Sequence, residues 1–230
     1  MQAKKRRLIW ICMAVIVLSV ASFLFYVFIN DRPGGLSDQR MSKLLGMNET
    51  IRIPTGETPE NAIQKFRGNH PESQIIYKEQ VEEGMILFTR RPSSESSNLQ
   101  VEYARKRIFG WKWGWGGGYA INQSSPSQFV MDYMSIPRLD HISTPFPMIF
   151  GNVLDPAIKR VTVESKVNGE HVSTEAKLVE VGPESTIWFV FPPATVKTPF
   201  EIKGFNDDGV VVTSKEIKDE NDSGTMSIEK

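Results

Sequence analysis

The chain has 230 residues, with 27 basic and 27 acidic side chains and a single cysteine, Cys12. All four charges before residue 31 are basic, so residues 31–230 hold 27 − 4 = 23 basic and 27 acidic side chains, a net charge of −4. This acidic balance argues against general nucleic-acid binding, which favours a basic domain. Because no cysteine follows Cys12, the region beyond it has no thiol nucleophile, no Cys-x-x-Cys redox pair and no thiolate metal site.

An uncharged, apolar run of 22 residues, Leu8–Ile29, follows four basic residues, Lys4–Arg7. As a helix it covers about 33 Å at 1.5 Å per residue, enough to cross a hydrocarbon core of about 30 Å. Trp10 and Tyr26 lie near its two ends, where amphipathic rings prefer the headgroup level. We therefore predict a transmembrane helix over residues 8–29, in contact with the lipid bilayer.

A cleavable signal peptide is the alternative, with Ser19-Val20-Ala21 as its small-x-small site. The chain stays apolar beyond that site, where a cleaved precursor would turn polar, so we favour an uncleaved signal anchor. The basic residues hold residues 1–7 in the cytoplasm by the positive-inside rule. We expect a single-pass protein of the cell membrane, with its N-terminus cytoplasmic and its later domains extracytoplasmic. The absence of cysteine from those domains favours a bacterial envelope.

Residues 30–57 form a predicted juxtamembrane spacer, which contains a short helical candidate at Ser37–Leu45. If flexible, residues 31–57 reach only about 30 Å r.m.s.. The spacer would therefore keep the folded part close to the membrane.

A small α+β domain is predicted over residues 58–122. Thr58-Pro59-Glu60 has the composition of a helix start, and Gly68 that of a helix end. Strand-like runs follow, at 74–78, 85–90, 99–109 and within 111–122. One helix followed by an antiparallel meander predicts a helix packed on an antiparallel sheet.

An all-β domain is predicted over residues 146–217, after a Ser- and Pro-rich linker at 123–145. Six short strands are expected there, and Asn206-Asp207-Asp208-Gly209 is a strong hairpin signal. With Trp188 as the expected core aromatic, the pattern resembles a bacterial immunoglobulin-like β-sandwich, although only in architecture and without the inter-sheet cysteines of antibody domains. Residues 218–230 are expected to be disordered.

Three tryptophans at a spacing of two, Trp111, Trp113 and Trp115, are the most unusual feature beyond the anchor. In an extended strand this spacing puts all three indoles on one face. Two interpretations are open. The indoles form an exposed platform that stacks on sugar rings or enters a membrane interface, or they face the helix and fill the core of the α+β domain.

Basic side chains adjoin these tryptophans, chiefly Arg105, Arg107 and Lys112, together with Lys106. Near a membrane, this cluster would bind anionic lipid headgroups or an anionic wall polymer. The alternative is a solvated strand face whose charges serve solubility.

Signals of catalysis are few. The three histidines are scattered without metal-ligand spacing, and Asp140, His141 and Ser143 resemble a hydrolytic triad in composition only. We predict no catalytic residues, no metal site and no cofactor. The leading hypothesis is a non-enzymatic, membrane-anchored accessory protein that contacts an envelope protein partner. The second is glycan or polyanion binding through the Trp and Arg cluster, and the third an envelope hydrolase.

Overall fold

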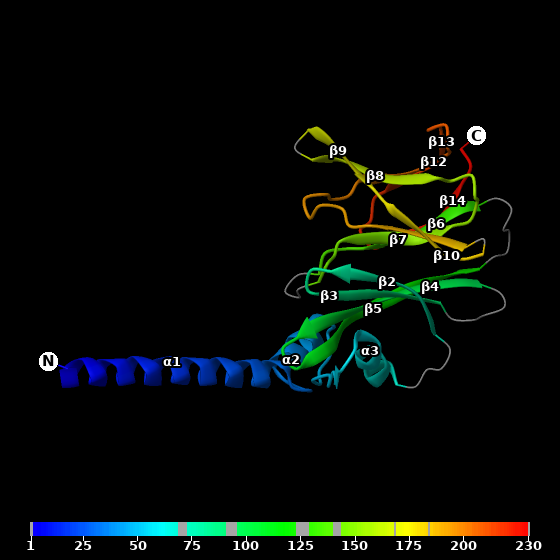
Figure 1. Ribbon diagram of the computed structural model, residues 1–230. Helices are drawn as coiled ribbons and strands as arrows, with labels where there is room; N and C mark the ends of the chain where they lie inside the picture. The colour runs from blue at the N-terminus through cyan, green and yellow to red at the C-terminus, as the bar shows by residue number, and fades with distance from the viewer. Residues whose placement is uncertain are drawn as a thin grey trace. The chain divides into compact units, whose positions relative to one another are not determined.

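A long apolar helix precedes a body of antiparallel β-sheets in the computed structural model of the chain (Figure 1). The structure divides into two compact units. Unit 1 comprises Met1–Asn69 and Arg105–Trp113, and unit 2 comprises His70–Ala104 and Gly114–Lys230. The residues that the structure describes are 2–68, 73–90, 96–122, 129–139, 144–167, 169–183 and 185–229.

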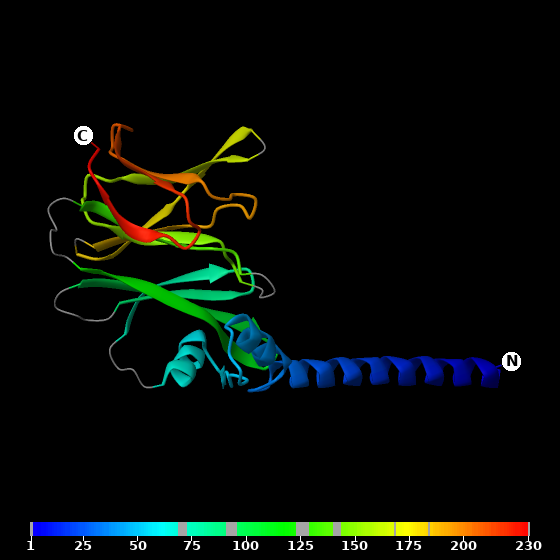
Figure 2. The ribbon, with the colours of Figure 1, turned by 180° about the vertical axis from the view of Figure 1, so that it is seen from behind.

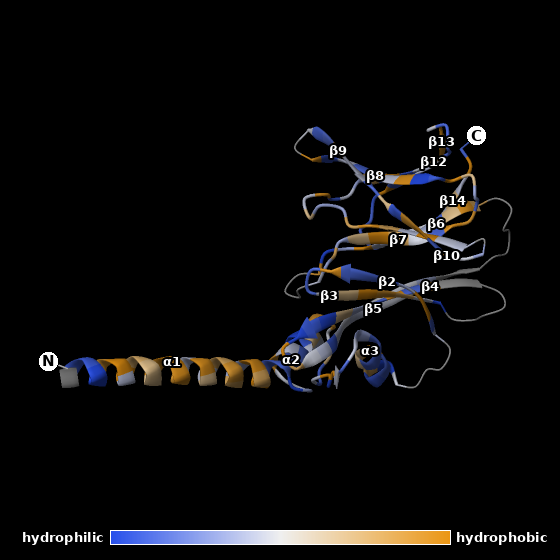
Figure 3. Ribbon diagram, in the orientation of Figure 1, coloured by the Kyte–Doolittle hydropathy of each residue, from blue (hydrophilic) through white to orange (hydrophobic). Residues whose placement is uncertain are grey.

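Helix α1 spans Gln2–Asp31 and is long and apolar enough to cross a membrane. Most of the helix is hydrophobic (Figure 3), and its apolar side chains are exposed along most of its length. Near the C-terminal end, the apolar side chain of Val27 is buried, and so is the acidic side chain of Asp31. The sequence prediction of one long N-terminal apolar helix is thus confirmed. Among its described side chains, burial begins only at Val27.

Unit 1 also contains two short helices and a short strand: α2 at Leu36–Leu44, β1 at Thr55–Gly56 and α3 at Pro59–Arg67. The predicted start and end of α3 are confirmed. The Thr58 side chain accepts a hydrogen bond from the Asn61 backbone N–H at 3.2 Å, and Gly68 ends the helix with a φ of +77°. The predicted spacer, residues 30–57, contains α2, close to the helix expected at Ser37–Leu45, and also β1, which was not expected.

The strands form three sheets. Sheet A has the order β1-β5-β4-β3-β2, sheet B the order β10-β11-β7-β6-β14 and sheet C the order β13-β12-β8-β9. Their bounds are β2 Gln74–Val81, β3 Gly84–Arg90, β4 Ser96–Arg107, β5 Gly110–Asn122, β6 Phe129–Ile136, β7 Met148–Val153, β8 Arg160–Val167, β9 Glu170–Glu175, β10 Lys177–Gly182, β11 Ser185–Val190, β12 Phe200–Phe205, β13 Val211–Ile217 and β14 Ser223–Ser227.

Within unit 2, sheet B is buried on both faces. One core lies between strands of sheets A and B, and a second lies between sheets B and C. The side chains of β11 alternate between them: Ile187 and Phe189 enter the first core, and Trp188 and Val190 enter the second. This arrangement explains why β11 reads as a continuous apolar run rather than an alternating one. The prediction of Trp188 as a core residue is confirmed, because its side chain is fully buried.

The structure differs from the predicted domains in three places. Strand β6 lies in the predicted linker, β9 was not expected, and β14 lies in the tail that was predicted to be disordered. Strand β14 pairs antiparallel with β6 at the edge of sheet B and buries Met226 (Figure 2, red). The linker predicted at residues 123–145 does not separate the two units. Strands before it and strands after it contribute side chains to the same core.

Candidate functional site

A buried ion pair joins α2 to strand β5 in unit 1. Lys112 Nζ lies 2.6 Å from Asp38 Oδ1, and the exposed fractions of the two side chains are only 3% and 1%. The other oxygen of Asp38 accepts hydrogen bonds from the backbone N–H groups of Gly34 at 2.8 Å and Ile53 at 2.9 Å. The carboxylate therefore fixes the turn before α2, the segment before β1 and the start of β5 at one point.

The ammonium group of Lys112 also reaches the C-terminal end of α1. It donates to the backbone carbonyl of Asp31 at 3.0 Å and to Ser37 Oγ at 3.2 Å. The Ser37 hydroxyl in turn donates to the carbonyl of Asn30 at 2.8 Å. A cation at a helix C-terminus satisfies carbonyls that have no partner within the helix. We name the group formed by Asp31, Ser37, Asp38 and Lys112 the junction cluster.

The three tryptophans do not share one surrounding. Trp113 is 8% exposed and stacks on Phe66 of α3, with ring centroids 4.1 Å apart. Trp115 is half-buried against Phe146, in the core between sheets A and B. Trp111 is half-buried, and the Lys106 ammonium lies 5.9 Å from its ring centroid. A continuous exposed platform is therefore absent, and the packing favours the core interpretation for Trp113 and Trp115.

The predicted basic cluster is also divided. Lys112 is buried in the junction cluster, whereas Lys106 is exposed and Arg105 is half-buried. Arg107 is partly exposed, and its Nε lies 3.8 Å from Asp31 Oδ1. Three of the four basic side chains thus keep contact with solvent. The fourth holds the junction cluster together.

A second polar cluster is buried in unit 2 around Asp132, whose side chain is fully buried. Its carboxylate accepts hydrogen bonds from the Asn152 backbone N–H at 2.5 Å and from the Tyr119 hydroxyl. Arg90 donates to Asn152 Oδ1 and to Ser185 Oγ, each at 3.0 Å. Burial raises the pKa of Asp132 to about 6, because desolvation of the carboxylate outweighs these hydrogen bonds. The cluster ties strands of sheet A to strands of sheet B.

The raised pKa of Asp132 predicts a pH-dependent stability. The folded state holds the proton more tightly than the unfolded chain, so this contribution is fully present below pH 3.8 and is lost as the pH rises through about 6. Urea unfolding should show that the wild type gains about 2 kcal/mol over Asp132→Asn between pH 7 and pH 4. The asparagine variant is the matched control because it does not titrate. An equal difference at both pH values would contradict the prediction.

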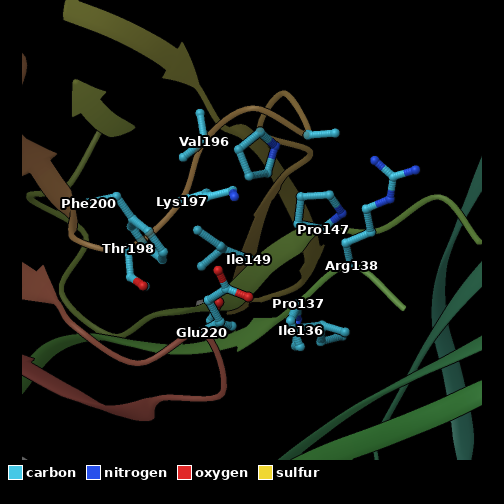
Figure 4. Close-up of a pocket in the computed structure, with 13 residues that line it drawn as sticks. Ile136, Pro137, Arg138, Pro147, Ile149, Val196, Lys197, Thr198, Phe200 and Glu220 are labelled. Carbon is cyan, nitrogen blue, oxygen red and sulfur yellow. The ribbon is translucent and has the colours of Figure 1, made fainter. Parts of the chain in front are cut away.

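A cavity of about 380 Å³ opens in unit 2 beside the ends of β6 and β7 (Figure 4). Ligand pockets typically span about 300–1,000 Å³, so this one has room for a small molecule or a few side chains. Ile136, Ile149 and Phe200 give it an apolar lining, and Lys197 and Glu220 bring opposite charges to it. The remaining lining residues are Ser135, Pro137, Arg138, Pro147, Pro192, Ala194, Val196 and Thr198.

The structure does not test the residues that resemble a hydrolytic triad in composition. Asp140, His141 and Ser143 lie outside the described residues. Among the described residues, no group of three His, Cys, Asp or Glu side chains could hold a metal ion.

The chain matches no protein-family model, no curated protein and no solved structure.

Proposed function

We propose that this protein is a non-enzymatic, membrane-anchored interaction protein of a bacterial envelope, with its sheets on the extracytoplasmic side. Helix α1 would cross the cell membrane, and the folded body would contact an envelope protein partner. The observation that carries the proposal is the junction cluster at the end of α1. The sequence of the apolar run and its basic flank supports the orientation.

A flexible link would be enough to attach the folded part to α1, without the buried ion pair of the junction cluster. Burying an ion pair costs desolvation energy that its attraction does not fully return, so such pairs add specificity of arrangement more readily than stability. Here the pair holds the last turn of α1 against α2 and the start of β5. A fixed attachment of this kind suits a protein that meets a partner in or on the same membrane.

We also propose that sheets B and C form an immunoglobulin-like sandwich. In that fold, one sheet holds strands A, B, E and D, and the other holds C, F and G with an optional C′. Assigning A to β6 and B to β7, then continuing along the chain, makes β8 and β9 strands C and C′. Strands β10 to β13 become D, E, F and G. The two sheets then read D-E-B-A, with β14 added beside A, and G-F-C-C′. Immunoglobulin-like modules commonly serve recognition, which supports an interaction role by analogy only.

The cavity beside β6 and β7 is the best candidate for the partner contact. Its apolar lining suits an inserted side chain, and the charges of Lys197 and Glu220 would orient a polar backbone or side chain. Because Trp113 and Lys112 are buried, glycan or polyanion binding through the tryptophan cluster has less support.

The proposed topology can be tested with single cysteines in a Cys12→Ala background. Val210→Cys should react with a membrane-impermeant maleimide in intact cells, because Val210 is 58% exposed in the sandwich. Gln2→Cys should react only after the cells are lysed. The reverse labelling pattern would contradict the orientation. Release of both cysteine variants when the membranes are washed would contradict the anchor.

The proposed contact can be tested by crosslinking in cells. A photoreactive amino acid at Lys197 should give an adduct with an envelope protein, whereas the same group at Glu170, an exposed position on β9, should not. Ala194→Trp, which fills part of the cavity, should reduce the adduct. Equal adducts from both positions, or an adduct insensitive to Ala194→Trp, would exclude the cavity as the contact.

A further inference from the structure

The turn between β4 and β5 exposes two large apolar side chains. Ile108 is 59% exposed and Phe109 is 51% exposed. Turns that face water are usually built from Gly, Pro, Asn, Asp and Ser, so an Ile-Phe pair at a turn has no explanation in local backbone chemistry. Two large apolar side chains at such a turn are expected to contact an apolar environment.

The depth of this turn relative to α1 is set by a ring contact within unit 1. The rings of Phe109 and Phe28 meet edge to face, with centroids 6.2 Å apart. Phe28 belongs to the apolar run within α1, and it lies one residue before that run ends at Ile29. If α1 crosses a bilayer, the ring of Phe109 lies at nearly the same depth as the ring of Phe28.

Cationic groups of the same hairpin lie farther out along α1. Arg107 Nε is 3.8 Å from the carboxylate of Asp31, and Lys112 Nζ is 3.0 Å from the Asp31 carbonyl. Asp31 follows Phe28 by three residues, which places it about 4.5 Å farther along the helix axis. The hairpin therefore points down the axis of α1, with its apolar tip deepest and its cations behind. This is the order in which side chains are arranged at a lipid interface.

The backbone holds the tip in this position. Gly110 has a φ of +123°, and a Cβ at this position would meet the carbonyl oxygen of Gly56 in β1 at 2.5 Å. Close approach of the two backbones fixes the turn beside β1, which pairs with β5 at Thr55 and Lys112. The turn is thus a braced projection rather than a free loop.

We propose that Ile108 and Phe109 are immersed in the outer leaflet of the bilayer that α1 spans, and that Arg107 and the exposed Lys106 contact its anionic headgroups. The inference rests on the proposed membrane anchoring and adds a second, shallow point of attachment. With α1 as the first attachment, the hairpin prevents free rotation of unit 1 about the helix axis.

Fluorescence of the full chain in vesicles of phosphatidylcholine and phosphatidylglycerol tests the inference. In a Cys12→Ala background, an environment-sensitive label at Ile108→Cys or Phe109→Cys should emit at shorter wavelength than the same label at Val210→Cys. Lipids that carry a nitroxide near the headgroup should quench it. Val210 is the matched control, because it is an exposed apolar residue beside the turn of another hairpin.

A label at Leu18→Cys, in the middle of α1, separates the two proposals when it is measured with lipids that carry the nitroxide deep in the acyl chain, because the centre of a core of about 30 Å lies about 15 Å from either headgroup layer. Quenching at Leu18 without quenching at either hairpin position would overturn the inference and leave the anchor intact. A tip that stays in water in vesicles without any other protein is not a lipid-binding tip, whatever partner covers it in cells. Absence of quenching at Leu18 would overturn the anchor, and the inference with it. Two hairpin positions are used because Phe109→Cys removes the contact with Phe28.

Discussion

Lys112→Ala should open the junction cluster. The substitution leaves the carboxylate of Asp38 buried without its cation, and removal of one partner from a buried pair costs about 3–5 kcal/mol. Hydrogen exchange of the Gly34 and Ile53 amides, which donate to Asp38, reports this opening directly. Their exchange should accelerate by roughly two to four powers of ten, since each 1.4 kcal/mol is a factor of ten.

Two controls make the result specific to burial. Lys177 forms an ion pair with Glu79 at 2.8 Å, but its side chain is 50% exposed, so Lys177→Ala should cost less than about 1 kcal/mol. The double variant Asp38→Asn with Lys112→Met removes both charges and should lose less than Lys112→Ala alone. If Lys112→Ala and Lys177→Ala had equal effects, the buried pair would not organise the junction.

Trp188→Ala should produce the largest loss of stability in unit 2. The side chain fills the core between sheets B and C, and its Nε1 donates to the Asp132 carbonyl at 3.0 Å. Truncating a buried tryptophan typically costs about 3–5 kcal/mol in lost transfer energy and cavity formation. Urea unfolding followed by far-UV circular dichroism should show this loss in the free energy of unfolding.

Two other substitutions should reduce the free energy of unfolding less, and they would show that the loss comes from removal of the Trp188 indole. Trp188→Phe keeps an aromatic ring and loses the hydrogen bond, so its effect should be intermediate. Trp111→Ala, at the half-buried end of β5 in unit 1, should leave the unfolding of unit 2 nearly unchanged. A Trp188→Ala loss below about 1 kcal/mol would mean that the core closes around the missing indole.

Features set by neighbouring residues could be predicted from the sequence. Helix α3 begins and ends where Thr58 and Gly68 indicated, because a cap and a left-handed glycine act within one turn. The long apolar run and the core role of Trp188 were likewise evident. In each case the signal is a local composition that few other environments satisfy.

Features that depend on distant partners could not be predicted. Lys112 belonged by composition to an exposed basic cluster, yet its partner Asp38 lies 74 positions earlier in the chain, as 112 − 38 shows. Strand β14 buries only Met226 among polar neighbours, and it is a strand because β6, about 90 residues away, offers it an edge. The spacing of the tryptophans indicated one shared face, whereas the structure gives them different surroundings.

The apolar turn at Ile108 and Phe109 was visible in the sequence, but its meaning was not. A strand continuing through Phe109 absorbed both residues into the expected sheet. Only the contact of Phe109 with Phe28 shows that the pair lies beside the C-terminal end of α1. The position of this turn could not be predicted, because it depends on a contact between residues far apart in the sequence.

The double burial of sheet B makes unit 2 indivisible. A cut between β5 and β6 would leave Met148, Phe150, Ile187 and Phe189 exposed to water on one fragment, as an apolar surface without its partner. The same cut would expose Phe88 and Val101 on the other fragment. A chain that folds as it emerges must therefore deliver β11 before the core between sheets A and B can close, and β13 and β14 before the core between sheets B and C is complete. Until then the strands already made are exposed to aggregation.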